Sequence, residues 1–73
     1  MAETFIDARA MRCPWPALRL ARAMREAAPG ATVRMAADDP KAPTEIAQLA
    51  DARGWSLIVS EAGAAGWTFT VTR

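Results

Sequence analysis

Alternation of apolar and polar side chains predicts the strands of this chain. The clearest stretch is 67–72, in which Trp67, Phe69 and Val71 alternate with threonines. This pattern is typical of a strand with one buried and one hydrated face. Shorter runs rich in apolar and β-branched residues predict three more strands, at 4–7, 32–36 and 56–60. We also predict a turn from Gly63 to Gly66, directly before the clearest strand.

Apolar residues at intervals of three and four predict a first helix from Pro14 to about Ala28, ended by Pro29 and Gly30. The stripe expected to face the core consists of Leu18, Ala21, Met24 and Ala28, widened by Ala17 and Leu20. Three basic residues lie on another face: Arg19, Arg22 and Arg25. We expect this basic side either to be hydrated or to dock an acidic partner.

A second helix is expected to run to about Arg53 and to be closed by Gly54. Its inward face should carry Ile46, Leu49 and Ala50. Two starting points fit the sequence. Asp39 can cap a helix that begins at Pro40, or the helix can begin at Pro43 with Glu45 in its first turn.

The expected order is strand–helix–strand–helix–strand–strand. The simplest way to bury two amphipathic helices beside four strands is to pack both on one face of the sheet. The predicted fold is therefore α+β, a two-layer α/β sandwich with a four-stranded mixed sheet. With 73 residues, we expect residues 1–73 to form a single domain.

Composition narrows the chemistry available to this domain. The chain is 52% apolar, with one cysteine, Cys13, and no histidine. An internal disulfide is therefore impossible and a zinc site of ordinary ligands is implausible, so we expect no metal and no cofactor. The net charge of +1 predicts neither a membrane nor a nucleic-acid partner. A lone thiol with no export signal fits a reducing cytoplasm, and nothing in the sequence requires more than a monomer.

Cys13 is the most informative residue because it lies in the sequence Cys13-Pro14-Trp15-Pro16 at the predicted start of the first helix. We expect Cys13 to be the N-cap, with Pro14 as the first helical residue. The helix dipole, the backbone N–H of Trp15 and the charge of Arg12 would then stabilise a thiolate. Pro14 and Pro16 would keep the helix start rigid. A buried structural thiol is the alternative.

Other readings of these residues are weaker or remain open. A thioredoxin-like reductase needs a second cysteine, and a cysteine protease needs a histidine, so both are unlikely. Trp15 can be either a core anchor or an exposed docking residue. Three acidic residues are expected in turns or caps rather than in acid–base catalysis: Asp7, Asp38 and Asp39. Trp55 and Trp67 are expected to be structural.

Three segments together resemble the TusA/SirA family of sulfur-carrier proteins. The segment 6–16 resembles the family's N-terminal signature, a Cys-Pro-x-Pro motif after a first strand ending in aspartate. Asp38-Asp39-Pro40 and the strand 69–73 match two further landmarks. The resemblance implies a cytoplasmic protein that accepts sulfane sulfur as a persulfide on Cys13. It also implies transfer of this sulfur to a partner protein.

The resemblance also implies partners and a docking surface. The sulfur donor is expected to be a cysteine desulfurase or a rhodanese-like protein. The acceptor is expected in tRNA thiolation, molybdenum cofactor assembly or sulfur oxidation. The residues expected to face the partner are Met11, Trp15, Arg19 and Arg22. Two other hypotheses are a regulatory interaction domain in which Cys13 is incidental and an RNA-binding module that uses the arginines.

The chain departs from the family pattern in two places. Ala10-Met11 stands where many members have Gly-Leu, and alanine lacks the easy access of glycine to positive φ. We therefore expect a slightly different loop before Cys13. Ala47-Gln48-Leu49 replaces a proline and an aromatic residue on the second helix, which puts docking on that surface in doubt.

Overall fold

The computed structural model describes residues 3–61, 63 and 66–73. Its elements follow the predicted order. They are β1 (Glu3–Asp7), α1 (Trp15–Glu26), β2 (Thr32–Ala37), α2 (Ala42–Arg53), β3 (Ser56–Glu61) and β4 (Trp67–Thr72). The strand 67–72 has the predicted bounds, and β2 and β3 each extend one residue beyond the prediction.

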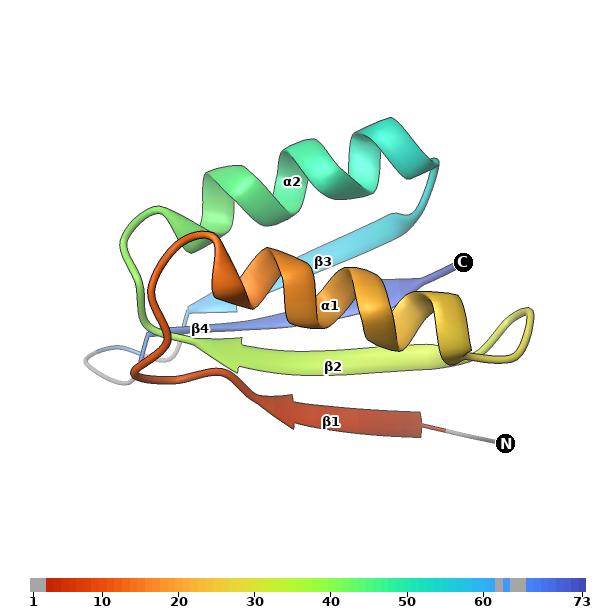
Figure 1. Cartoon of the computed structure of the whole chain (residues 1–73), viewed down its shortest axis with the longest axis horizontal. Coiled ribbons are helices and arrows are strands. Elements are labelled where there is room, and N and C mark those ends of the chain that lie inside the picture. Colours follow the sequence, from red (N-terminus) through yellow and green to blue (C-terminus); the bar gives the residue numbers. More distant parts are fainter. Residues whose placement is uncertain (1–2, 62, 64–65) are drawn as a thin grey trace.

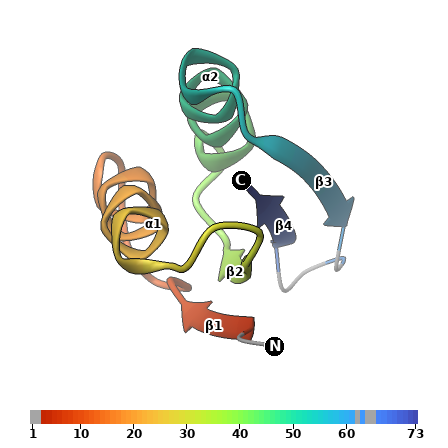
Figure 2. The same cartoon turned by 90° about the vertical axis from the view of Figure 1, so that its right-hand side faces the viewer.

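The four strands form one mixed sheet in the order β1-β2-β4-β3. β1 and β2 are parallel, whereas β4 pairs antiparallel with both β2 and β3. Figure 2 shows both helices on the same side of this sheet, and Figure 1 shows them running along it. The α+β sandwich with two helices on one face is therefore confirmed.

The core lies between the helices and the inner face of the two central strands. Phe69 and Val71 of β4 are fully buried and lie opposite Met35 and Val33 of β2. Leu20 and Met24 of α1 and Ile46 of α2 complete this layer. On the outer face, a row of side chains crosses the sheet at Phe5, Arg34, Thr70 and Ile58.

The predicted apolar stripe of α1 is confirmed in part, since Leu20, Ala21 and Met24 are buried and Ala17 packs against the core. Leu18 is 52% exposed and Ala28 is exposed. The prediction that these two residues face the core is therefore wrong. The buried residues of this helix are Pro16, Leu20, Ala21 and Met24. Residues 16, 20 and 24 repeat every four positions and point to the sheet together. Leu18 lies half a turn away from this row and faces outward.

α1 also ends earlier than Ala28. Glu26 is its last residue, and Ala27 already has an extended backbone with ψ 146°. The guanidinium of Arg73, directly after β4, donates hydrogen bonds to the carbonyls of Met24 and Ala27 at 3.2 and 3.1 Å. These bonds satisfy carbonyl groups that have no partner within the helix.

α2 begins at Ala42, with Lys41 as its N-cap residue. Neither predicted start is correct, although the second is closer because Pro43 and Glu45 lie in the first turn. Asp39 does not cap the helix. At the other end, Gly54 adopts φ 73° and closes the helix as predicted. Ile46 and Ala50 are buried and Leu49 is half-buried, which confirms the inward face.

The hairpin between β3 and β4 touches the end of β2. The amide of Gly66 donates to the carbonyl of Gly63 at 3.1 Å, in agreement with the predicted turn, whose Ala64 and Ala65 lie outside the described residues. Gly66 has φ 96°, and a Cβ at this position would lie 2.7 Å from the Cα of Asp38. Trp67 is half-buried against the core, as is Trp55, which agrees with structural roles.

Candidate functional site

Cys13 lies in the segment that connects β1 to α1, and its side chain is partly exposed. The Cys13–Pro14 peptide bond is cis, and these two residues form the centre of a turn. The amide of Trp15 closes this turn by donating to the carbonyl of Arg12 at 2.8 Å. The predicted N-cap is therefore wrong, since Pro14 is the N-cap residue and Trp15 the first helical residue. The Trp15 N–H is committed to Arg12, so it does not stabilise the sulfur.

Two adjacent aspartates after β2 hold this segment in place. Asp38 Oδ1 accepts a hydrogen bond from the amide of Ala10 at 2.9 Å. Asp39 Oδ2 accepts one from the amide of Cys13 at 2.6 Å, and its Oδ1 accepts another from the amide of Lys41 at 3.0 Å. Asp39 is only 6% exposed. The prediction of a turn here is confirmed, but the aspartates also anchor the cysteine segment.

The backbone before Cys13 takes the conformation that we expected alanine to avoid. Ala10 has φ 70°, in the left-handed region, and is the only described residue other than glycine with positive φ. The hydrogen bond that its backbone N–H donates to Asp38 Oδ1 holds it there. Ala10 therefore adopts a left-handed conformation, which costs about 1–2 kcal/mol for an ordinary residue with a Cβ.

Glu45 is the side chain that contacts the thiol. Cys13 Sγ donates a hydrogen bond to Glu45 Oε2 from the first turn of α2. This bond is the largest cause of a raised pKa of Cys13, and partial burial and the negative charges of Glu45 and Asp39 act in the same direction. The positive charge of Lys41 opposes them. The expected lowering of the Cys13 pKa by the helix start is thus outweighed in the free protein.

Arg12 acts on Asp39 rather than on the sulfur. The pKa of Asp39 is lowered, first by the hydrogen bond from the Lys41 amide and next by the bond from the Cys13 amide. The charges of Arg12 and Lys41 contribute further. Arg12 therefore supports the carboxylate that anchors the segment, and Lys41 is the cation that favours the thiolate.

Trp15 follows Cys13 by two residues, lies at the surface and is 60% exposed. Leu18 follows three positions later on α1, so the two exposed apolar side chains share one side of its first turns. We refer to Trp15 and Leu18 as the apolar patch. Of the two readings of Trp15, the core anchor is excluded. Met11 differs, because it is partly buried and packs against the core.

The comparisons with known proteins agree with this geometry. Residues 4–73 match the family model described as "Sulfurtransferase TusA". The chain belongs to the TusA family. This membership gives the chain a role in carrying sulfur, in general terms. Among solved structures, a SirA-like protein from Desulfitobacterium hafniense has the same fold, with a TM-score of 0.86 and 23% sequence identity. The match covers 94% of this chain and 95% of that one.

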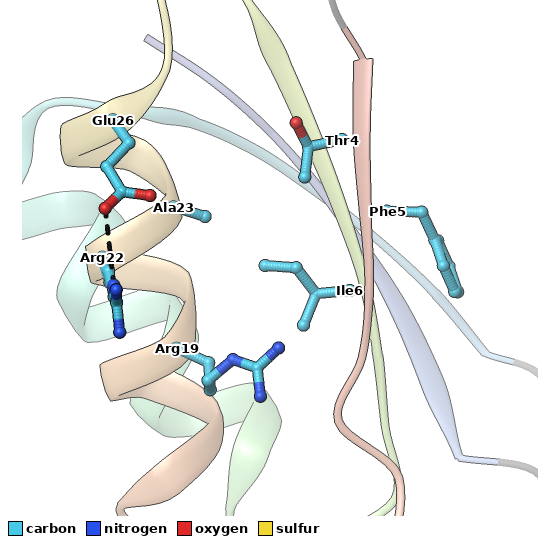
Figure 3. A pocket seen from close by; sticks show the side chains of 7 residues that line it. All are labelled: Thr4, Phe5, Ile6, Arg19, Arg22, Ala23 and Glu26. Atoms are coloured by element: carbon cyan, nitrogen blue, oxygen red, sulfur yellow. Dashed lines mark hydrogen bonds and ion pairs between the residues drawn. The ribbon is translucent and has the colours of Figure 1, made fainter.

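The arginines expected to dock partners of this TusA-family protein lie apart from the thiol. Arg19 and Arg22 line a groove of about 370 Å³ between α1 and β1, together with Ala23, Glu26, Thr4, Phe5 and Ile6. In Figure 3, Arg19 and Ile6 point into the space between helix and strand, and Phe5 lies on the other side of β1. Arg22 pairs with Glu26 at 3.4 Å. Trp15 is therefore exposed two residues after Cys13, whereas the two arginines line a groove whose lining does not include Cys13.

Sequence reasoning missed Glu45 and Lys41 as residues of the Cys13 site. The sequence pattern indicates Glu45 only as a first-turn residue of α2 and gives no role to Lys41. The family landmark Asp38-Asp39-Pro40 indicates only that the segment before α2 matters, and the contact of α2 with the motif is seen only in the structure. Within the described residues, no helix is long and apolar enough to cross a membrane.

Proposed function

We propose that this protein accepts sulfane sulfur as a persulfide on Cys13 and passes it to a partner protein. The observation that carries the proposal is the position of Cys13 in a TusA-family chain. Its thiol is partly exposed between β1 and α1, and its amide is fixed by the buried carboxylate of Asp39. A fixed backbone with a reachable sulfur suits a group that must be presented alternately to two partners.

The transfer needs no oxidant and no cofactor. The Cys13 thiolate attacks the terminal sulfur of a donor persulfide, and the donor's S–S bond breaks as the new S–S bond forms. The donor leaves as a thiolate, which takes up the proton that Cys13 has lost. The product is Cys13 persulfide and a donor thiol. Attack by an acceptor thiolate on the terminal sulfur of Cys13 repeats the same exchange in the second transfer.

Docking is proposed to use the apolar patch beside the thiol. Exposed tryptophans are enriched among the residues that dominate protein interfaces, and a donor must approach Cys13 closely enough for the sulfurs to touch. Met11 is partly buried against the core, so its part in docking is smaller, and Arg19 and Arg22 extend the contact over the groove beside β1. The partners we propose are a cysteine desulfurase or a rhodanese-like donor, and a thiol acceptor in tRNA thiolation, molybdenum cofactor assembly or sulfur oxidation. The lone thiol is consistent with a reducing compartment such as the cytoplasm.

Intact-mass analysis after incubation with a cysteine desulfurase and cysteine tests the proposal. We expect the gain of one sulfur atom, removed by a reductant and absent in Cys13→Ser. A rhodanese-type donor with thiosulfate provides a second route to loading. No adduct with either donor, on protein that is folded by circular dichroism, would reject the relay and favour an interaction domain.

A further inference from the structure

The contact between Cys13 and Glu45 carries an inference that rests on the proposed function. A sulfur carrier is expected to favour its thiolate, yet the thiol here donates a hydrogen bond to a carboxylate. This bond is available only to the protonated thiol, so it stabilises the unreactive form. When Cys13 loses its proton, this bond is lost and the thiolate lies beside the Glu45 carboxylate.

The charged groups around the sulfur leave it in a negative setting. Glu45 contacts the thiol from α2, and Asp39 lies on the Cys13 amide from the segment after β2. Lys41 is the cation that acts on the sulfur, while the charge of Arg12 is directed at Asp39. The first turn of α1 contributes no acidic residue. The sulfur is thus influenced by two negative charges, Glu45 and Asp39, and by one positive charge, Lys41.

We propose that Glu45 is a specificity-determining residue, which selects sulfur donors that carry a positive group beside the transferable sulfur. A lysine or arginine of a protein donor would pair with the Glu45 carboxylate and break the hydrogen bond between Glu45 and the Cys13 thiol. Anionic low-molecular-weight donors such as thiosulfate would meet repulsion at the same place. The selectivity then discriminates a docked protein from free sulfur anions.

The atoms of the transfer remain balanced under this proposal. The donor's positive group takes the place of the thiol proton as the partner of Glu45, and the proton is released to solvent. The thiolate attacks the terminal sulfur of the donor persulfide, and the donor leaves as a thiolate that recovers a proton from solvent. Glu45 neither gains nor loses a covalent bond.

Thiol–disulfide exchange with two charged probes measures the selectivity directly. Cystamine carries positive groups beside its S–S bond, and 3,3′-dithiodipropionate carries negative groups at similar distances. The rate of mixed-disulfide formation at Cys13 is followed by intact mass at low ionic strength. The ratio of the two rates is informative because a change in thiolate fraction affects both probes equally. Asp51→Asn, in the same helix but two turns further along, is the matched control.

In the wild type, we expect cystamine to react about tenfold faster than the anionic probe, as a few unit charges near a protein surface can produce. Glu45→Gln should bring the ratio close to one, and Asp51→Asn should leave it unchanged. Raising the salt concentration should reduce the wild-type ratio. Equal ratios in the wild type and Glu45→Gln would overturn the proposal.

Two further measurements, the rate ratio in Lys41→Gln and sulfur loading from a desulfurase, separate failure of this inference from misfolding and from failure of the proposed function. Lys41→Gln removes the opposing positive charge and should increase the ratio, so it tests the same idea if Glu45→Gln does not fold. An unchanged or lower ratio in folded Lys41→Gln would count against it. Because these probes carry no sulfane sulfur, loss of charge preference rejects this inference alone. Failure to load sulfur from a desulfurase rejects the proposed function instead.

Discussion

The starts of the two helices look alike in sequence but differ in what they do. Each has proline in its first turn, and neither shows a side-chain cap among the described residues. The first residue of α1, Trp15, is 60% exposed although Pro16 after it is buried, whereas the first residue of α2, Ala42, is fully buried. The α1 start carries the thiol. The α2 start and the aspartates before it supply the groups that hold this thiol and set its protonation.

This difference shows that the Cys13-Pro14-Trp15-Pro16 motif does not form the site alone. Cys13 receives its backbone anchor from a residue 26 positions further along the chain and its side-chain partner from one 32 positions further. The reactivity of the motif is therefore controlled from a segment that carries no cysteine chemistry of its own. Four predictions test this difference between the two helix starts, in order of decreasing expected effect.

The largest effect is expected from removing the anchor with Asp39→Ala. The amides of Cys13 and Lys41 would lose their acceptor in a buried place, and buried donors without a partner are costly. We expect the melting temperature to fall by about 10 °C in a domain of this size. Asp38→Ala is the matched control and should cost less, since water can reach the exposed amide of Ala10.

The same carboxylate gives the effect a pH dependence. The pKa of Asp39 is lowered in the folded protein, chiefly by the Lys41 amide. Its contribution to stability is therefore complete above the unfolded pKa of about 3.9 and is lost as pH falls through the folded value. The melting temperature of Asp39→Asn should depend less on pH below 4 than that of the wild type. Parallel curves for the two proteins would contradict this assignment.

The next effect is expected at the exposed helix start. Trp15→Ala removes a surface side chain, so the free energy of unfolding should change by less than about 0.5 kcal/mol. Sulfur loading from a protein donor should nevertheless slow by about tenfold or more if Trp15 anchors the complex. Ile58→Ala is the matched control, because Ile58 is 65% exposed on the outer face of the sheet. Equal loading rates in both variants would remove Trp15 from the docking surface.

The smallest effect is expected at Ala10. Glycine relieves the cost of φ 70° but also increases the freedom of the unfolded chain, so Ala10→Gly should stabilise by up to about 1 kcal/mol. Urea unfolding measures the difference. Ala52→Gly, in the exposed part of α2, should have the opposite sign with a loss of about 1 kcal/mol. Destabilisation by Ala10→Gly would mean that the methyl group makes an unrecognised contact.

Much of the fold could be predicted from local patterns. The strand 67–72 alternates over its whole length, and one of its faces is buried in the way that the pattern requires. The stripe of α1 was confirmed at Leu20, Ala21 and Met24 but wrong at Leu18 and Ala28, because alanine, leucine and methionine occur on several sides of the helix. Packing against the sheet selected the row through Leu20 and Met24 and left Leu18 in solvent.

The site could be predicted only where it is local in sequence. The position of Cys13 between a strand and a helix follows from the motif and the pattern around it. Its cap register was wrong because the Trp15 amide closes a turn back to Arg12, which delays the helix by one residue. Glu45 and Lys41 could not be found in this way, since their proximity to Cys13 depends on how α2 packs beside α1.

Gly66 extends the reach of the site to a third segment. Its backbone lies against Ala37 and Asp38 with no space for a Cβ, and Asp38 in turn binds the amide of Ala10. Any side chain at position 66 would collide with Asp38, which accepts a hydrogen bond from the segment before Cys13. In a saturation library scored for sulfur loading, a position in a surface hairpin should therefore tolerate as little variety as the positions that surround the thiol.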